Sequence, residues 1–290
     1  MANSEIGTAR GVRRRTPALL GLHAAPRGVF RIGLALLPFI LLLAVYLVFA
    51  QARHAENRDD KVLPTFTQMA HAVDRMAFTE DARTGSYLLW SDTLASLKRL
   101  ALGLTLAGIV GLWLGLNMGV FPGFKELTTP FVTFLSMIPP LAILPTLFIS
   151  FGVDELAKVM LIFIGVFPVL TRDIQLAVQR IPREQITKAL TLGASNLSLT
   201  YRIVLPQILP RLIEAIRLSL GSAWLFLIAA EAIAAEQGLG YRVFLVRRYL
   251  AMDVILPYVL WITLLGYAID LALRFVLRTC FRWYGVGEDK

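Results

Sequence analysis

Few side chains in the long apolar stretches of this sequence could take part in chemistry or transport. Glu231 has no basic residue within a helical turn on either side, so it is the best candidate for a polar group that faces a pathway through a membrane. A charged side chain at mid-membrane costs at least about 2.5–3.5 kcal/mol, and such residues usually serve function. Ser136, Ser219 and Ser222 could line the same pathway, or each hydroxyl could hydrogen-bond its own helix.

The other charged residues of these stretches can pair within one helix. Glu214 and Arg217 are three residues apart, and Asp270 and Arg274 are four apart, the spacings at which side chains meet on a helix. The three histidines all lie outside these stretches: His23, His54 and His71. With a single cysteine, Cys280, the sequence predicts neither a metal site nor a catalytic residue at depth.

Composition places the chain in a membrane. Of its 290 residues, 57% are hydrophobic and 17% are charged, whereas soluble domains are about 45–50% apolar and about 25% charged. The net charge of +9 is not gathered in a basic run interleaved with stacking aromatic residues, so we expect no nucleic-acid partner. The sequence predicts an all-α, polytopic membrane protein in contact with membrane lipid.

Apolar runs of about 20 residues predict six transmembrane helices. The expected divisions are a basic tail (1–32), a first span (33–50), an outer segment (51–87), a core with five spans (88–284) that contains a polar loop (179–206), and a short tail (285–290). Small residues around Ala50 could mark a cleaved signal, but the apolar run is long and we expect a retained anchor. Lys and Arg residues are more numerous on one side of the predicted spans, and the positive-inside rule therefore places that side, with the loop and both termini, in the cytoplasm.

Two features predict how the spans pack and bend. In the second predicted span (93–118) and just after it, a small residue recurs at every fourth position: Gly103, Ala107, Gly111, Gly115 and Gly119. This spacing predicts a groove that allows close helix packing. Prolines gather in the next two spans, 127–150 and 156–178, and predict bent helices: Pro130, Pro139, Pro140, Pro145 and Pro168.

The polar loop contains an amphipathic pattern. Apolar residues with helical spacing predict one face that can dock onto a partner or lie in lipid headgroups: Ile186, Ala189, Leu190, Ala194 and Leu197. Pro182 suits the first turn of this helix, and Gly193 suits its C′ position. Ser195 can cap a second short helix that runs to about Tyr201.

These residues resemble the signature of binding-protein-dependent ABC importer permeases. Gly193 is followed, after nine residues, by Ile203-Val204-Leu205-Pro206, as in the family pattern, while Thr187, Lys188 and Ala189 stand where that pattern has Glu-Ala-Ala. The passages "SMIPPLAILPTLFISFGVDELAK" (136–158) and "AIRLSLGSAWLFLIAAEAIAAEQGLGY" (215–241) resemble the subgroup that serves nitrate, bicarbonate, sulfonates and taurine. The likeness extends over roughly residues 60 to 284.

The resemblance implies a type I permease fold in a bacterial inner membrane, with the loop docked on an ATPase subunit. It implies these loop residues as the coupling site: Glu184, Thr187, Lys188, Ala189, Gly193, Ala194, Ser195, Leu197 and Tyr201. The implied partners are ATPase subunits, a periplasmic solute-binding protein and a second permease copy. The sequence has no G-x-x-x-x-G-K-[ST] loop, so ATP and magnesium are expected on the ATPase and no cofactor on this chain.

The sequence leaves alternatives open for the solute and for the energy source. The subgroup favours a small anion, but importers of vitamins or pyrimidine-like solutes resemble the same permeases. An ion-coupled secondary transporter ranks lower, because we find no internal repeat and few unpaired acids. We do not expect an intramembrane enzyme, because the three histidines lie outside the predicted spans and none can act as a catalytic base within the membrane.

Overall fold

The computed structural model describes residues 29–56, 62–82 and 85–284, which form helices and no strand. The chain divides into two units, residues 1–63 and 64–290. The first contains α1 (Val29–Glu56), which is apolar and long enough to cross a bilayer, and the predicted span 33–50 lies within it. Most of the predicted basic tail, 1–32, and all of the tail 285–290 lie outside the described residues.

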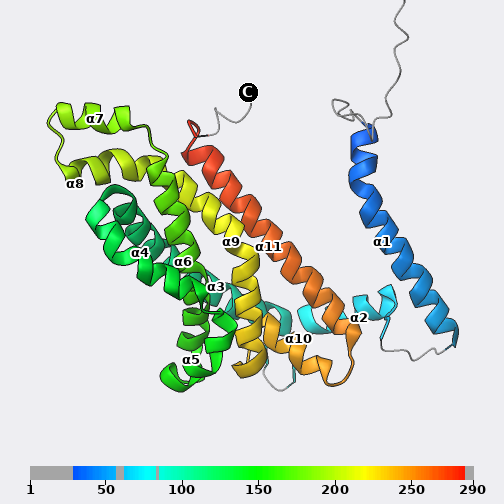
Figure 1. The fold of residues 1–290 in the computed structure, drawn as a ribbon. Helices are drawn as coiled ribbons and strands as arrows, with labels where there is room; N and C mark the ends of the chain where they lie inside the picture. Colours follow the sequence, from blue (N-terminus) through cyan, green and yellow to red (C-terminus); the bar gives the residue numbers. More distant parts are fainter. Residues whose placement is uncertain (1–28, 57–61, 83–84, 285–290) are drawn as a thin grey trace, which may run out of the picture. The chain divides into compact units, whose positions relative to one another are not determined.

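The second unit is a bundle of long helices joined by short ones (Figure 1). Its elements are α2 (Phe66–Ala77), α3 (Leu88–Val120), α4 (Pro122–Met137), the 3₁₀ helix η1 (Pro140–Ile143), α5 (Leu144–Phe151), α6 (Glu155–Gln179), α7 (Arg183–Thr191), α8 (Asn196–Ser198), the π-helix η2 (Leu199–Val204), α9 (Leu205–Ala234), α10 (Leu239–Arg247) and α11 (Met252–Cys280). Figure 1 shows α7 and α8 at one end of this bundle and α5 and α10 at the other.

Five helices of the described residues are long and apolar enough to span a membrane, and a bent pair makes a sixth candidate. The pair consists of α4 and the segment Pro140–Phe151, which meet at 81°. The sequence predicted one span over 127–150, but the chain breaks at Pro139-Pro140 because neither residue has an N–H to continue the helix. The predicted bending is confirmed here, and with this pair taken as one span the six predicted crossings are present.

The closest helix pair is α3 with α6. A Cβ atom added at Gly111 would lie 2.9 Å from the Leu170 Cβ, and one at Gly115 would lie 2.5 Å from the Thr171 carbonyl oxygen. Ala107, on the same face, is fully buried. Lipid gives no hydrophobic drive for helix pairing, so contact at this distance has to supply the stabilisation. The predicted small-residue groove is therefore confirmed as the seam between α3 and α6.

A second, smaller apolar cluster lies beneath α7. It joins the ends of α3 and α6 to the loop and the start of α9 and consists of Leu116, Ile174, Val178, Ala189, Leu199, Val204 and Ile208. The main core joins α3, α6 and α9 along the rest of their length. Both ends of the α3–α6 pair are thus tied to other elements of the bundle.

We predict that Gly115→Ala destabilises the protein by about 1–3 kcal/mol, because the new methyl group must push the α6 backbone away. The control is Gly221→Ala in α9, where nothing lies within 4 Å of the added Cβ. Thermal unfolding of the purified protein in detergent measures both. Equal melting temperatures for the two variants would contradict the close contact.

Candidate functional site

The loop at one end of the bundle begins with α7. Pro182 is the residue just before the helix rather than part of its first turn, and Arg183 is the first helical residue. Glu184 lies in the first turn and Lys188 in the last. Because a helix has a partial positive charge at its N-terminus and a partial negative charge at its C-terminus, both side chains stabilise this short helix.

The end of α7 is a Schellman motif centred on Gly193. This glycine has φ +84°, in the left-handed region that favours glycine. The Ala194 N–H donates to the Ala189 carbonyl at 3.1 Å, and the Gly193 N–H donates to the Leu190 carbonyl at 3.0 Å. These two bonds satisfy carbonyls that the helix end would leave unpaired. The predicted C′ position of Gly193 is confirmed.

Ser195 begins the second helix of the loop. Its hydroxyl accepts a hydrogen bond from the Ser198 N–H at 3.2 Å, which confirms the predicted cap. The helix does not end at Tyr201, as the sequence suggested, but continues through η2 into α9. The π-helical turn ends at Val204, two residues before Pro206, which has no N–H for an α-helical bond.

The predicted apolar stripe of the loop is divided between two faces. Ala189 is only 8% exposed, and Ile186 and Ala194 are half-buried, all three packed in the cluster beneath α7. These residues hold α7 against the ends of α3, α6 and α9. The prediction that the stripe forms one docking face, toward a partner or lipid headgroups, is corrected for these three residues, because the bundle itself covers them.

The rest of the stripe, Leu190 and Leu197, faces outward together with two apolar residues outside the stripe. Leu192 is 88% exposed and Leu197 is 65% exposed, and Leu190 and Tyr201 are exposed beside them. Glu184, Thr187 and Lys188 are exposed as well, and the Thr187 hydroxyl donates to the carbonyl four residues before it. Large apolar side chains at a polar, turn-rich end of a bundle are typical of a protein–protein contact.

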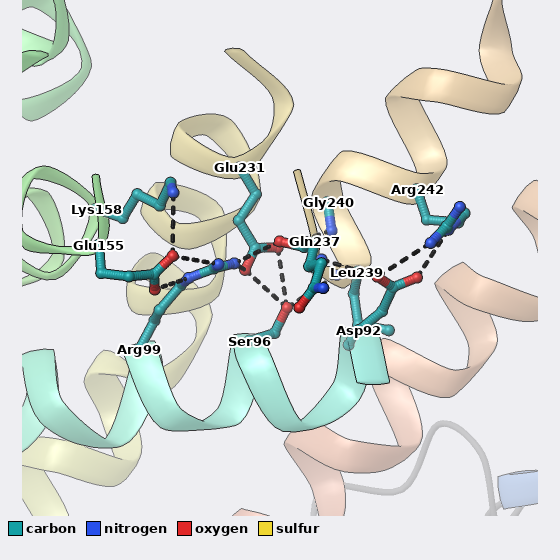
Figure 2. A network of polar contacts seen from close by, with 11 residues as sticks. Asp92, Ser96, Arg99, Glu155, Lys158, Glu231, Gln237, Leu239, Gly240 and Arg242 are labelled. Carbon is teal, nitrogen blue, oxygen red and sulfur yellow. Dashed lines mark hydrogen bonds and ion pairs between the residues drawn. The ribbon is translucent and has the colours of Figure 1, made fainter. Parts of the chain in front are cut away.

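A polar network lies at the other end of the bundle (Figure 2). Its core is a row on one face of α3, formed by Asp92, Ser96 and Arg99. Each of these side chains is buried, and each bonds to the turn between α9 and α10 or to a side chain beside it. We call these residues and their partners the polar network.

Glu231 of α9 is the centre of the network. Its carboxylate is fully buried and accepts the Ser96 hydroxyl at 2.8 Å and the Gly240 N–H at 2.9 Å. The Arg99 guanidinium donates to it at 2.6 Å. With both oxygens occupied by donors, this carboxylate is suited to holding helices together and not to proton transfer.

Arg99 connects three helices. Besides Glu231, its guanidinium binds both oxygens of Glu155 on α6, at 2.5 and 2.6 Å, and the Gln237 carbonyl at 2.7 Å. Lys158 adds a second cation on Glu155 at 3.3 Å. Such a two-pronged pairing fixes geometry better than a single contact. The arginine therefore ties α3, α6 and α9 together.

Asp92 fixes the turn that follows α9. Its carboxylate accepts the Gly238 N–H at 2.9 Å and the Arg242 guanidinium at 2.8 Å. Gly238 has φ +135°, and an added Cβ would lie 2.5 Å from the Glu231 carboxyl carbon, so this position requires glycine. Burial is the largest single influence on the pKa of Arg242 and lowers it, but the hydrogen bond and charge of Asp92, together with Tyr258 and Tyr241, raise it by more, so the pKa lies above its ordinary value.

The structure corrects the interpretation of the charged residues in the spans. Glu231 does not face an open pathway, because its side chain is fully buried. Its partners Ser96 and Arg99 lie on α3, far from it in the sequence, so the residues next to Glu231 gave no sign of them. Arg217 pairs with Asp270 of α11 at 2.8 Å instead of with Glu214. The predicted pair of Asp270 and Arg274 is confirmed at 2.7 Å.

The serines predicted for the pathway differ in their surroundings. Ser219 is buried in α9, and the exposed Ser222 donates to the Ser219 carbonyl. Ser136 donates to the Thr133 carbonyl, so the helix-bonding alternative holds for Ser136 and Ser222. Ser136 also lines a cavity of about 240 Å³, whose polar lining is Lys125, Thr129, Thr133, Ser136, Arg172, Gln175 and Gln179. We call it the α4–α6 cavity.

Known proteins share this sequence and this fold. Residues 107–282 match the family of binding-protein-dependent transport system inner membrane components. The taurine transport system permease of Escherichia coli (strain K12) is 34% identical over 197 residues, 68% of this chain and 72% of that protein. A putative aliphatic sulfonates transport permease of the same strain is 32% identical over 196 residues, 67% of this chain and 74% of that protein.

The chain belongs to this family. It is a permease subunit of an ABC importer, a multi-pass membrane protein and not an enzyme. A chain of an inward-facing methionine ABC transporter has the same fold, with a TM-score of 0.59 and 20% identity over 66% of this permease and 95% of that chain. The permease fold predicted from the sequence is confirmed.

We predict that Glu231→Ala lowers the stability of the permease by about 3–5 kcal/mol, because it leaves Ser96, Arg99 and the Gly240 N–H without their acceptor. The control is Glu236→Ala, five residues along and exposed. Thermal unfolding in detergent measures the difference. A Glu231→Ala variant that melts together with the Glu236→Ala control would show that the network does not stabilise the bundle.

Proposed function

We propose that the permease moves a small anion across the membrane, and that the anion passes the α4–α6 cavity. The end of the bundle with α7 faces the cytoplasm and receives the ATPase subunits. The solute-binding protein delivers the anion at the end with α10. Two permease copies form the importer, and ATP with magnesium is held by the ATPase.

The charge of the α4–α6 cavity carries this proposal. Its lining contains the Lys125 ammonium and the Arg172 guanidinium and no acidic residue. Among the residues that the structure describes, neither of these two cations forms an ion pair. Hydroxyls of Thr129 and Thr133 and the amide of Gln175 add hydrogen-bonding groups. Cations with nearby neutral donors recognise sulfonate-like and carboxylate-like anions.

The named relatives support the same class of solute. One is a taurine transport permease and another is a putative permease for aliphatic sulfonates, and taurine and aliphatic sulfonates all contain a sulfonate group. Because the pathway binds its solute only in passing, a few donors and two cations suffice, and tighter binding would slow release.

The outward face of α7 and α8 supports the docking of the ATPase. Leu192 and Leu197 offer exposed apolar contacts, and Glu184 and Lys188 offer charges beside them. The inward face, with Ala189, fixes α7 to the bundle. A partner that pushes on Leu192 therefore pushes on the ends of α3 and α6 as well, because packed helices move as units.

We predict that Arg172→Gln lowers anion uptake about tenfold, the effect of losing one charged hydrogen bond, while ATPase binding persists. A thermal-shift screen of the cognate binding protein first identifies the anion, and uptake is then measured in proteoliposomes with the complete importer. Arg172→Lys should retain most uptake. Arg180→Gln, just after α6 and outside the cavity lining, is the matched control. Equal uptake by the Arg172→Gln and Arg180→Gln variants would refute the anion route.

We predict that Leu192→Asp abolishes co-purification of the ATPase and leaves the melting temperature of the permease unchanged, because the Leu192 side chain is 88% exposed and packs little against the bundle. Ala189→Asp should instead lower the melting temperature, since it places a charge in the cluster beneath α7. Tyr249→Asp, exposed at the opposite end, is the control for a surface charge. Retention of the ATPase by the Leu192→Asp variant would contradict docking at this face.

A further inference from the structure

A second polar cavity lies between α9 and the end of α11. It has a volume of about 350 Å³, and four arginines line it: Arg217, Arg274, Arg278 and Arg282. Glu214 is the acidic residue of the lining, and its Oε2 accepts hydrogen bonds from Arg211 at 3.2 Å and from the Tyr284 hydroxyl at 2.9 Å. We call this the basic cavity. The bond from Tyr284 to Glu214 places it at the end of the bundle where α9 begins, the end that carries α7.

The basic cavity has more positive than negative charge. Asp270, beside it, is shared by Arg217 and Arg274, at 2.8 and 2.7 Å. Among the described residues, Arg278 and Arg282 form no ion pair, and both are exposed. These two arginines can therefore bind an anion without breaking an ion pair within the described part of the chain.

The spacing of the arginines also favours a bound anion. Arg274, Arg278 and Arg282 follow one another at intervals of four residues, on one side of α11 and just beyond its end. Like charges at this interval repel each other and destabilise a helix. A phosphate between the guanidinium groups would remove this repulsion and accept hydrogen bonds from them.

The surface next to the arginines is apolar, which points to a lipid. Leu264, Leu271 and Phe275 are exposed and lie at helical spacing on the face of α11 that Arg278 and Arg282 continue. Trp283 is 56% exposed at the same end, where tryptophan marks the boundary between membrane and water. An acyl chain fits along the apolar residues while the phosphate reaches the arginines. A free anion would contact only the arginines and not the apolar residues.

We propose that the basic cavity binds the phosphate headgroup of one anionic phospholipid, with its acyl chains along α11. The lipid neutralises Arg278 and Arg282 and holds the ends of α9 and α11 together in the leaflet on the α7 side. Basic pockets between membrane helices on the cytoplasmic side are suited to such headgroups. The site is separate from the α4–α6 cavity and does not depend on the solute.

The test is native mass spectrometry of the permease–ATPase complex, freed of lipid and titrated with phosphatidylglycerol or phosphatidylcholine. The wild type should retain phosphatidylglycerol at least about tenfold more tightly than phosphatidylcholine, the effect of one or two charged hydrogen bonds. Arg278→Gln with Arg282→Gln should remove this preference. Arg278→Lys with Arg282→Lys should keep most of it, which shows that the variants fold. The matched control removes two exposed charges at the end of α10, Arg247→Gln with Arg248→Gln, and should keep the preference.

Three outcomes would overturn the proposal. The first is an unchanged preference in the Arg278→Gln and Arg282→Gln variant. The second is thermal stabilisation of the wild type by inorganic phosphate that equals the effect of phosphatidylglycerol, which would identify a site for a free anion. The third is loss of the ATPase from this variant with lipid retention intact, which would make the arginines a protein contact.

Discussion

The structure of the permease depends on the close approach of α3 and α6. Hydrophobic burial does not drive helices together in lipid, so stabilisation comes from contacts that only small residues allow. At Gly115 the α6 backbone lies where a larger residue would place its Cβ. Both helices continue to the ends of the bundle, where the loop with α7 is attached to them at one end and the polar network at the other. A wider separation of this pair would displace both regions.

The two ends of the pair are fixed by different physical means. At the end with α10, Arg99 joins Glu155 of α6, whose side chain is exposed, to the buried Glu231 of α9. The pair with Glu231 is strong because water is scarce around it. At the end with α7, an apolar contact that includes Ala189 and Val178 lies beside an ion pair between Arg211 of α9 and Asp173 of α6. An apolar contact can slide or repack with little loss, whereas a buried ion pair resists separation. The α7 end therefore combines a contact that can repack, around Ala189, with an ion pair that resists separation, between α6 and α9.

Features that depend on local spacing could be predicted from the sequence. The C′ position of Gly193, the cap at Ser195 and the glycine groove all follow from a few neighbouring residues. Contacts between distant segments could not be predicted: Arg99 and Glu231 are 132 residues apart, and Glu231 therefore looked unpaired. For the same reason the sequence could not show which half of the α7 stripe is exposed, because contacts with α3, α6 and α9 decide which half is covered. Gly238 and Gly240 were the available signal for the network, since a turn rich in glycine after a buried acid often holds its carboxylate with N–H groups.

The central claim is that the outward face of α7 lies in the cytoplasm and binds the ATPase. Thiol labelling tests it directly, with Leu192→Cys in a chain whose single cysteine, Cys280, is replaced by serine. A membrane-impermeant maleimide is added to right-side-out spheroplasts or to inside-out vesicles, with and without the ATPase. The account predicts labelling in inside-out vesicles alone, and protection when the ATPase is bound. Labelling from the outside of spheroplasts would contradict it.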